Sequence, residues 1–538
     1  MVEKKLLSGK NVTYKKLNYA NFFNGINADF DQYILPVTYS NNTYNFSFVS
    51  GALTTGLGIS NLKLPATYTL GDKTERVVNF EDKFEFKASW LFRKKYEQIL
   101  GQEGLFYSNY LIFQTTSGDF YVYDICTNTE YVKQILNINL SSVPVVLNYN
   151  LNGEDSVLIC SEEGMWVFNL TSSYATKIEN APQIKSMCLH YERLFAITHN
   201  DHNAVWFSDD LNPTNWNVSL NEAGFIKFND ERGMVNKIVS FNDYVYVFRD
   251  YGISKITAYA QQTEFSANQL FVSSGKIYGN SVCVCGDKIL MLTQNGIYVF
   301  DGYSTTKLNL NINKLLENTQ NPFVQSCYSN GKYYLACNLN FNDGKQIGCE
   351  VGSYNNNVLL ELDLNTNTLN ILRGVDVRHL NAVADDKVNK VIAFYYSNGK
   401  YMLGEVGAFG ALHSFVLPKC WTSPLGDLGY PEKQKIVKTI YLKSNVPVKI
   451  TIRTERVNKT FNAVPKNNLI KLNTLVKGNL VAIDFETSQK ECTISSPTVV
   501  VGLVWLTMVN LHIIELTIYI EIIKLLTSIF AVIAFQLR

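Results

Sequence analysis

Two polar side chains that stand close together in the sequence could perform acid–base chemistry. His190 and Glu192 are separated by one residue in "CLHYERLF", and a strand would place both on one face and Arg193 on the other. A His–Glu pair can exchange a proton with a substrate. Polar neighbours on a strand more often hydrogen-bond to an adjacent element. We therefore predict polar contacts between neighbouring β-sheets for these three residues and for Arg249 and Asp250.

The stretch "WFSDDLNPTNWNVS" at 206–219 resembles the Ser-x-Asp-x-Gly-x-Thr-Trp hairpin of sialidase-like propellers. That hairpin is structural in those proteins and occurs several times per chain. Here it occurs once, Asn212 stands in place of the glycine, and Asn215 is inserted before the tryptophan. Ser, Asp and Asn side chains bond their own backbone in turns, and tryptophans anchor loops. The residues predicted to form and anchor this turn are Trp206, Ser208, Asp210, Asn212, Pro213 and Trp216.

A sialidase-like enzyme would also need arginines that converge on a substrate carboxylate, and a Tyr–Glu pair with an acidic partner. Five arginines are spaced so that they could meet in a ring of repeats. They are Arg193, Arg232, Arg249, Arg373 and Arg378. Sequence spacing does not show whether they do, and a carbohydrate-active or carbohydrate-binding propeller stays open as an alternative.

The sequence contains no motif for nucleotide binding, for a nucleophilic serine or for metal binding. There is no P-loop, no dinucleotide-binding glycine motif and no GxSxG elbow. The histidines have neither HxH nor HExxH spacing, and no histidine follows Cys283 and Cys285 at the spacing of a metal site. We predict a protein without catalytic residues, cofactor or metal, whose ten cysteines are free thiols in a reducing compartment.

A repeated strand pattern must position these residues. A turn with Gly or Asp precedes an aromatic-Val-aromatic strand in "GDFYVYD" (118–124), "EGMWVFN" (163–169), "NDYVYVFRD" (242–250) and "NGIYVFD" (295–301). The leading aromatics, with Trp206 as a variant, are 45, 40, 40 and 52 residues apart. This period is typical of one four-stranded propeller blade per repeat. We predict an all-β chain with a β-propeller of five to seven blades over residues 81–415.

The flanking regions differ from the repeats. Residues 421–498 alternate polar and apolar side chains, which predicts a small β-sandwich. Residues 1–80 are predicted to be an N-terminal arm or strands that complete a blade. Helical periodicity is weak, and only "KFEFKASWLFRKKYEQIL" (83–100) and "LNINKLLEN" (310–318) suggest short helices.

The last 40 residues, 499–538, are mostly apolar. Three interpretations stay open for this tail: an out-of-frame or unstructured segment, an apolar helix packed on the body, or a membrane anchor. A membrane partner is not expected unless the tail is a genuine segment. The N-terminus has no apolar core of signal-peptide length, so we expect the protein to stay in the cytoplasm where it is made.

The composition agrees with a β-protein of low charge. The 538 residues include 32 Tyr and 31 Phe, charged residues make up 18%, and the net charge is +1. Aromatic residues favour strands. A nearly neutral chain has no general attraction to nucleic acid or to anionic membranes, so any contact with DNA would be local.

Five segments in chain order carry a resemblance to a known class of proteins. They are "IKSMCLHYERLFAI" (184–197), "VWFSDDLNPTNWNVSLNEAGFIKF" (205–228), "VSFNDYVYVFRDYGISKITAY" (239–259), "SSGKIYGNSVCVCGDKILMLTQNGIYVFDGYS" (273–304) and "ILRGVDV" (371–377). Over about residues 45–500 the chain resembles virion structural proteins from the tail-gene regions of phages and prophages of low-GC Gram-positive bacteria. More loosely, it is similar to tail-hub or packaged-DNA stabilisation proteins of short-tailed phages. "FSDDLNPTNW" and "FRDYGIS" are its most specific parts.

The resemblance implies a non-enzymatic virion component, assembled in the cytoplasm of the host bacterium. It would be a ring subunit at the neck or tail that contacts copies of itself and other virion proteins and lines a passage for DNA. A neutral propeller without catalytic motifs suits such assembly.

Overall fold

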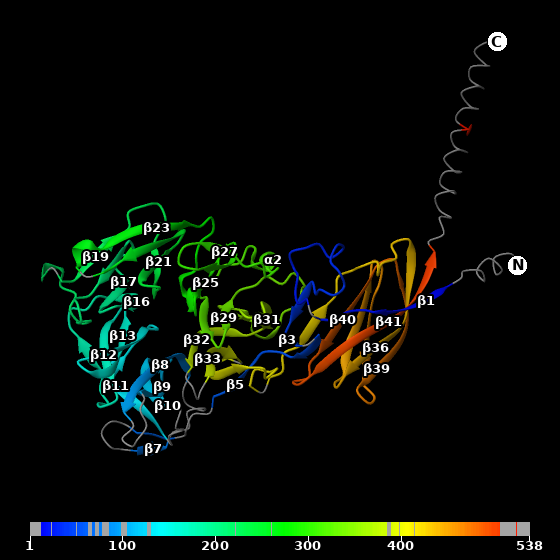
Figure 1. Cartoon of the computed structure of the whole chain (residues 1–538). Helices are drawn as coiled ribbons and strands as arrows, with labels where there is room; N and C mark the ends of the chain where they lie inside the picture. The colour runs from blue at the N-terminus through cyan, green and yellow to red at the C-terminus, as the bar shows by residue number, and fades with distance from the viewer. Residues whose placement is uncertain are drawn as a thin grey trace, which may run out of the picture.

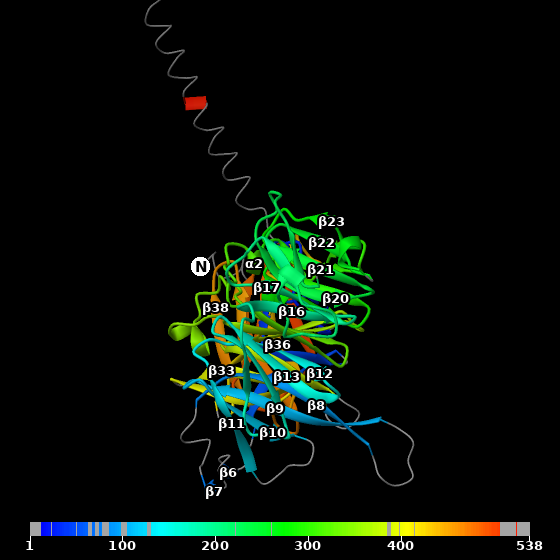
Figure 2. The same ribbon diagram turned by 90° about the vertical axis from the view of Figure 1, so that its left-hand side faces the viewer.

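The computed structural model describes residues 12–22, 24–49, 51–62, 67–69, 75–77, 85–97, 105–125, 131–220, 222–259, 261–384, 389–397, 399–413, 415–505 and 523–524. The chain is all-β. A series of sheets, each with four antiparallel strands, makes up one part, and two further sheets, one of which contains β1 and β41, lie beside it (Figure 1). Seen from the side, the series lies in front of these two sheets (Figure 2).

Seven sheets of the described residues each contain a four-stranded antiparallel unit. The first contains β8 (Phe86–Glu97), β9 (Leu105–Thr115), β10 (Asp119–Asp124) and β11 (Tyr131–Asn139), extended by β6 (Thr67–Thr69) and β7 (Glu75–Val77). The second contains β12 (Val145–Leu151), β13 (Glu154–Ser161), β14 (Gly164–Asn169) and β15 (Thr176–Ile178). The third contains β16 (Ile184–His190), β17 (Arg193–Thr198), β18 (Ala204–Phe207) and β19 (Gly224–Lys227). The fourth contains β20 (Val235–Phe241), β21 (Tyr244–Arg249), β22 (Gly252–Thr257) and β23 (Ser266–Val272).

The remaining units follow in chain order. The fifth contains β24 (Cys283–Cys285), β25 (Lys288–Thr293), β26 (Gly296–Phe300) and β27 (Thr305–Lys307). The sixth contains β28 (Gln325–Ser329), β29 (Lys332–Cys337), β30 (Val358–Asp363) and β31 (Thr368–Arg373). The seventh contains β32 (Asp376–Ala384), β33 (Asn389–Ser397), β34 (Lys400–Gly407) and β5 (Gly58–Asn61). These sheets resemble propeller blades, as the repeat pattern predicts.

Three of the aromatic-Val-aromatic strands are buried on both faces, whereas Tyr298 and Val299 of the fourth, β26, are half-buried. β10, β14 and β21 are inner strands of their sheets, and their four central residues are all buried. A strand covered on both faces reads as a continuous apolar run rather than an alternating one. Short turns join the strands: Asn242 and Asp243 both have positive φ, 45° and 62°, as a two-residue hairpin turn requires.

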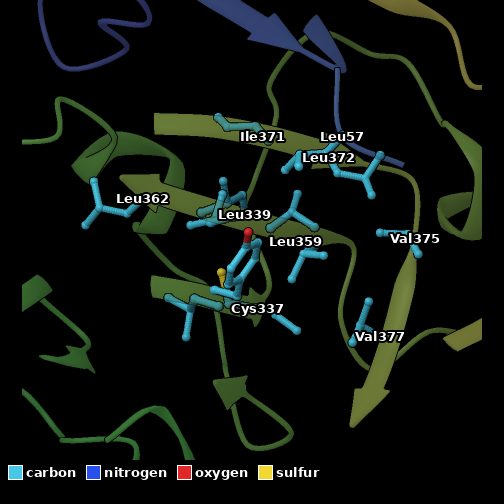
Figure 3. Packing of buried hydrophobic residues seen from close by; sticks show 14 of the residues in the cluster. Leu57, Cys337, Leu339, Leu359, Leu362, Ile371, Leu372, Val375 and Val377 are labelled. Carbon is cyan, nitrogen blue, oxygen red and sulfur yellow. The ribbon is translucent and has the colours of Figure 1, made fainter. Parts of the chain in front are cut away.

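The seventh sheet joins segments that are far apart in the sequence. Its outer strand β5 pairs antiparallel with β34, and Val406 lies opposite Ile59. Ile59 is fully buried in a cluster that also includes the apolar side chains of β29, β30 and β31. Leu57 reaches the same cluster, beside Leu359 and Leu372 (Figure 3). An N-terminal strand thus completes a sheet whose other three strands come from residues 376–407.

Two more sheets hold the C-terminal region and the start of the chain. One has the order β3 (Phe46–Val49), β4 (Ala52–Thr55), β41 (Thr493–Trp505), β36 (Lys433–Ser444), β39 (Leu469–Gly478), and β1 (Thr13–Asn18) also pairs with β41. The other has the order β2 (Asn42–Tyr44), β35 (Lys419–Thr422), β40 (Val481–Thr487), β37 (Val448–Thr454), β38 (Asn458–Ala463). Both contribute to one apolar cluster around Trp421. Burial along β37 and β39 largely alternates, as expected for strands with one covered face.

Two expectations change. Residues 83–100 were expected to be helical, but Phe86–Glu97 form β8, because pairing with β9 along its length overrides local preference. The segment at 310–318 does contain a helix, α2 (Asn313–Leu316), and short 3-10 turns lie at Val218–Leu220, Gln262–Glu264, Gly279–Ser281 and Gly348–Val351.

The predicted tail does not begin at residue 499 in the structure. Val499, Val501 and Leu503 are buried in β41, since this strand pairs with both β1 and β36. Residues 506–522 and 525–538 lie outside the described part. No helix in the described part is long and apolar enough to cross a membrane.

Candidate functional site

The turn that follows β18 is built as a self-bonded loop. Ser208 is fully buried; its Oγ accepts a hydrogen bond from the Leu194 N–H at 3.0 Å and donates to the Asp209 carbonyl at 2.9 Å. Asn212 Oδ1 accepts from the N–H and the hydroxyl of Thr214. Trp216 Nε1 donates to the Pro213 carbonyl at 3.0 Å. Ser208, Asn212, Pro213 and Trp216 thus take part in a turn whose side chains hydrogen-bond to nearby backbone and to one another.

One member of the predicted turn has a different place. Asp209, not Asp210, bonds the turn: its carboxylate accepts from the Asp210 N–H at 2.7 Å and from Asn215 Nδ2 at 2.9 Å. The residue inserted relative to the sialidase box is thus the one that binds this carboxylate. Asp210 is exposed. Trp206 packs at the edge of the apolar cluster, with its ring 4.9 Å from that of Phe225.

Of the residues predicted to make contacts between sheets, His190 contacts the next sheet: its Nδ1 lies 2.9 Å from Ser240 Oγ on β20. Arg193 instead binds within its own sheet, where Nη1 donates to the carbonyls of Ser208 and Glu222. The Glu192 side chain is exposed at the β16–β17 turn. Arg193 points back into its own loops because those carbonyls have no strand partner to satisfy them.

Arg249 and Asp250 bind the connections between neighbouring sheets. Arg249 is 1% exposed; it donates to the Gly233 carbonyl and pairs with Asp230, both on the connection from β19 to β20. Asp250 accepts from the Met234 N–H at 2.9 Å and pairs with Lys276 at 3.4 Å, ahead of β24. Both charged side chains therefore bind the loops that connect neighbouring sheets.

The five arginines that a sialidase-like site would need are used separately. Arg193 and Arg249 bind backbone carbonyls of different loops, as described above. Arg373 pairs with Asp343 and Glu350 on the sixth sheet. Arg378 pairs with Asp376 at 2.6 Å. Four of the five are therefore held by their own surroundings.

A cleft of about 320 Å³ lies between the third and fourth sheets. We name it the Tyr191 cleft. Its lining residues are His190, Tyr191, Glu192, Arg193, Phe195, Asp210, Ala258, Tyr259 and Phe265. His190, Glu192, Arg193 and Asp210 belong to sequence-predicted sites, whereas Tyr191 does not. The last three come from the β22–β23 loop and carry no signal in the sequence.

Aromatic rings form much of the cleft. The ring of Tyr191 lies 4.4 Å from that of His190 and 5.5 Å from that of Tyr259. Tyr191 and Tyr259 are 52% and 46% exposed. Tyr191 has a φ of 50°, a conformation that costs a bulky residue energy and that clusters at functional sites. Its ring is thereby held at the mouth of the cleft.

Titratable groups around the cleft respond to burial and to negative charge. Burial lowers the pKa of His190, so the imidazole is neutral at pH 7. A hydrogen bond with Tyr259, desolvation and the charge of Asp243 raise the pKa of Tyr191. Burial, followed by the charges of Asp210 and Glu192, raises the pKa of the nearby Tyr149. The carboxylates of Asp243, Asp210 and Glu192 thus contribute negative charge around the cleft.

The described cysteines are free. Cys283 and Cys285 lie on β24, where Cys285 Sγ contacts the Cys283 carbonyl at 3.5 Å. Within the described residues, no group of three or more His, Cys, Asp or Glu side chains could hold a metal ion.

Comparisons with known proteins show likeness to solved structures alone. No family model matches the sequence, and no curated protein matches it. The extracellular domain of a candidate one-component system from B. thetaiotaomicron has 11% identity and a TM-score of 0.38, over 77% of this chain and 56% of that one. BamB from Moraxella catarrhalis has 8% identity and a TM-score of 0.34, over 68% and 93%. PorZ, a type-IX secretion component of Porphyromonas gingivalis, has 12% identity and a TM-score of 0.30, over 64% and 55%. The chain thus spans about half the length of two of these proteins.

Proposed function

We propose that this chain is a non-enzymatic structural component of a phage or prophage virion, a ring or hub subunit that acts through protein–protein contacts. Its architecture would be a seven-bladed propeller closed by β5, joined to a β-sandwich made from both ends of the chain. The order of the seven four-stranded sheets and the shared core around Trp421 support this architecture.

An apolar loop carries the proposal. Phe30, Tyr33 and Ile34 are 58%, 60% and 73% exposed within five residues. Exposed apolar side chains gathered in one place are typical of protein interaction sites. The loop is held in shape, since Asp29 accepts from Asn313 Nδ2 at 2.6 Å and from the Lys314 N–H at 2.9 Å. A preformed apolar surface loses little conformational entropy on binding.

The use of the arginines supports a structural role over the sialidase-like alternative. A substrate carboxylate needs guanidinium groups with free donors directed at one point. Arg193, Arg249 and Arg373 direct their donors at backbone carbonyls and carboxylates of separate loops.

Self-association tests the assembly part of the proposal. The triple variant Phe30→Ser, Tyr33→Ser, Ile34→Ser should reduce the assembled fraction in light scattering after size exclusion, because it removes the apolar contact. Val464→Ser is the matched control, since Val464 is 74% exposed on the C-terminal sheets. Assembly that is unaffected by the triple variant would remove the loop from the proposal.

The virion part has its own test. Mass spectrometry of particles purified after prophage induction should detect the chain in a constant ratio to the portal protein. The gene for this chain should be flanked by genes for portal, terminase or tape-measure proteins. Particles that lack the chain would refute the virion role.

A further inference from the structure

We propose that the Tyr191 cleft binds an organic cation with N–H donors, an alkylammonium or guanidinium group such as a lysine or arginine side chain supplies. This proposal does not depend on a virion role. It rests on three properties of the cleft: its excess of negative charge, its aromatic wall and a buried acceptor without a partner.

The carboxylates at the cleft are not neutralised. Glu192 and Asp210 are exposed, and Asp243 accepts a hydrogen bond from the Tyr191 hydroxyl at 3.4 Å. None of the three forms an ion pair with a described residue. Arg193 is the one cationic side chain of the lining, and its Nη1 is occupied by two carbonyls at 3.1 and 2.6 Å. Three carboxylates thus stand against one guanidinium, so the net charge around the cleft is negative, which disfavours an anionic ligand.

The aromatic wall suits a cation. Tyr191 and Tyr259 meet at an interplanar angle of 39° and are each about half exposed, so ring faces stay open at the mouth. Phe265 continues the wall and contacts Phe195 and Phe207 at 6.1 and 5.1 Å. A cation over an aromatic face is attracted by the ring quadrupole, and a neighbouring carboxylate adds to this attraction.

The buried acceptor is His190 Nε2. His190 is 3% exposed, and its Nε2 has no hydrogen-bond partner among the described residues. In the tautomer whose Nδ1 donates to Ser240 Oγ, Nε2 carries a lone pair. A buried polar atom without a partner is costly, and a ligand N–H would satisfy it. This property favours a primary ammonium or guanidinium over a quaternary ammonium.

Saturation-transfer NMR on the full chain tests the proposal. The probes are N-acetyl-lysine methylamide and N-acetyl-arginine methylamide, compared with the neutral N-acetyl-norleucine methylamide, with tetramethylammonium and with N-acetylglucosamine. The two cationic amides should bind about fivefold more tightly than the neutral amide, and tetramethylammonium should bind less well than either. A lysine-rich peptide that binds more tightly than the single amides would assign the ligand to a protein partner, while equal binding would assign it to a small amine.

Two isosteric substitutions keep the shape of the cleft and remove its charge. The double variant Glu192→Gln, Asp210→Asn should weaken binding of the cationic amides about fivefold, and Tyr259→Ala should weaken it as well. Asp287→Asn is the matched control, because Asp287 is 86% exposed and lies at the β24–β25 turn of another sheet. Both carboxylates are exposed, so the double variant should keep the circular dichroism of the wild type. Unchanged binding in the double variant, or tighter binding of N-acetylglucosamine than of the cations, would overturn the proposal.

Discussion

Replacing Arg373 with methionine should destabilise the protein more than any surface substitution. The guanidinium is 1% exposed and lies where the sixth sheet meets the N-terminal strand β2, with its centre 4.8 Å from the ring of Tyr44. It pairs with Asp343 at 2.6 Å and with Glu350 at 3.0 Å, and its centre lies 4.0 Å from the ring of Phe341. Methionine fills a similar volume but leaves two largely buried carboxylates unpaired. Removing one side of a buried ion pair costs about 3–5 kcal/mol.

A rescue variant separates unpaired charge from lost packing. If the carboxylates cause the cost, the triple variant Arg373→Met, Asp343→Asn, Glu350→Gln should regain most of it, because replacing all members of a buried charge cluster is often nearly neutral. Lys449→Met is the control. Lys449 pairs with Glu486 at 3.0 Å but is 48% exposed, so its loss should cost under about 1 kcal/mol.

Urea unfolding followed by tryptophan fluorescence measures these differences, and pH gives an independent check. Burial alone would raise the pKa of Asp343, but the hydrogen bonds from Arg373, the Lys345 N–H and Asn42, together with the charge of Arg373, outweigh it, and the pKa lies below its ordinary value of 3.8. This depressed pKa stabilises the fold above pH 3.8, and the contribution is lost as the pH falls below that value. The gap between wild type and Arg373→Met should therefore narrow in acid. A single variant within about 1 kcal/mol of wild type, or a triple variant no better than the single one, would refute the reasoning.

Three further changes have defined outcomes. Burial and the charge of Lys237 lower the pKa of His379 from 6.5 to about 4. The unfolded chain therefore binds a proton at this histidine before the folded chain does, and the free energy of unfolding should fall as the pH is lowered from 6.5 to 4. The variant His379→Gln should reduce this pH dependence of the urea midpoint, and an unchanged pH dependence would contradict the role of His379. Ile59→Ala should cost about 2–5 kcal/mol and speed hydrogen exchange in β5 and β34, whereas unchanged exchange there would argue against closure by β5. Ser208→Ala should lower the free energy of unfolding by about 1–3 kcal/mol because the buried Leu194 N–H loses its side-chain acceptor. An unchanged free energy of unfolding in urea would contradict the stabilising role of this turn.

The sequence predicts the strands better than it predicts their partners. Aromatic-Val-aromatic runs identify strands covered on both faces, and alternation identifies strands covered on one face, because each pattern follows directly from burial. The pairing of β5 with β34 joins residues 347 positions apart, from Ile59 to Val406. No local preference encodes such pairing; it depends on the space that the last sheet leaves open. The assignment of β1–β4 to the C-terminal sheets has the same cause.

Only part of the candidate site could be predicted from the sequence, because the rest depends on contacts between distant segments. The cluster from His190 to Arg193 stands out because four polar or aromatic residues are adjacent in the chain. Tyr259 and Phe265 join it only through the contact between the third and fourth sheets. Asp210 was expected to hydrogen-bond within the turn, but the preceding residue, Asp209, has this role. The exposed carboxylate of Asp210 lines the cleft instead. Local motifs thus locate one wall of a site, whereas the opposite wall requires the tertiary structure.

The two proposals predict different responses to salt: assembly should persist, whereas cation binding should be lost. The assembly loop offers the apolar side chains of Phe30, Tyr33 and Ile34, and apolar contacts are not weakened by ionic screening. The Tyr191 cleft attracts its cation through exposed carboxylates, so raising the ionic strength from 0.01 to 1 M shortens the Debye length from about 30 to about 3 Å and should release the ligand. Assembly that persists in high salt together with loss of cation binding would assign the two events to separate surfaces. Parallel loss of both would indicate that the cleft itself holds the subunits together through a basic side chain of the neighbouring copy.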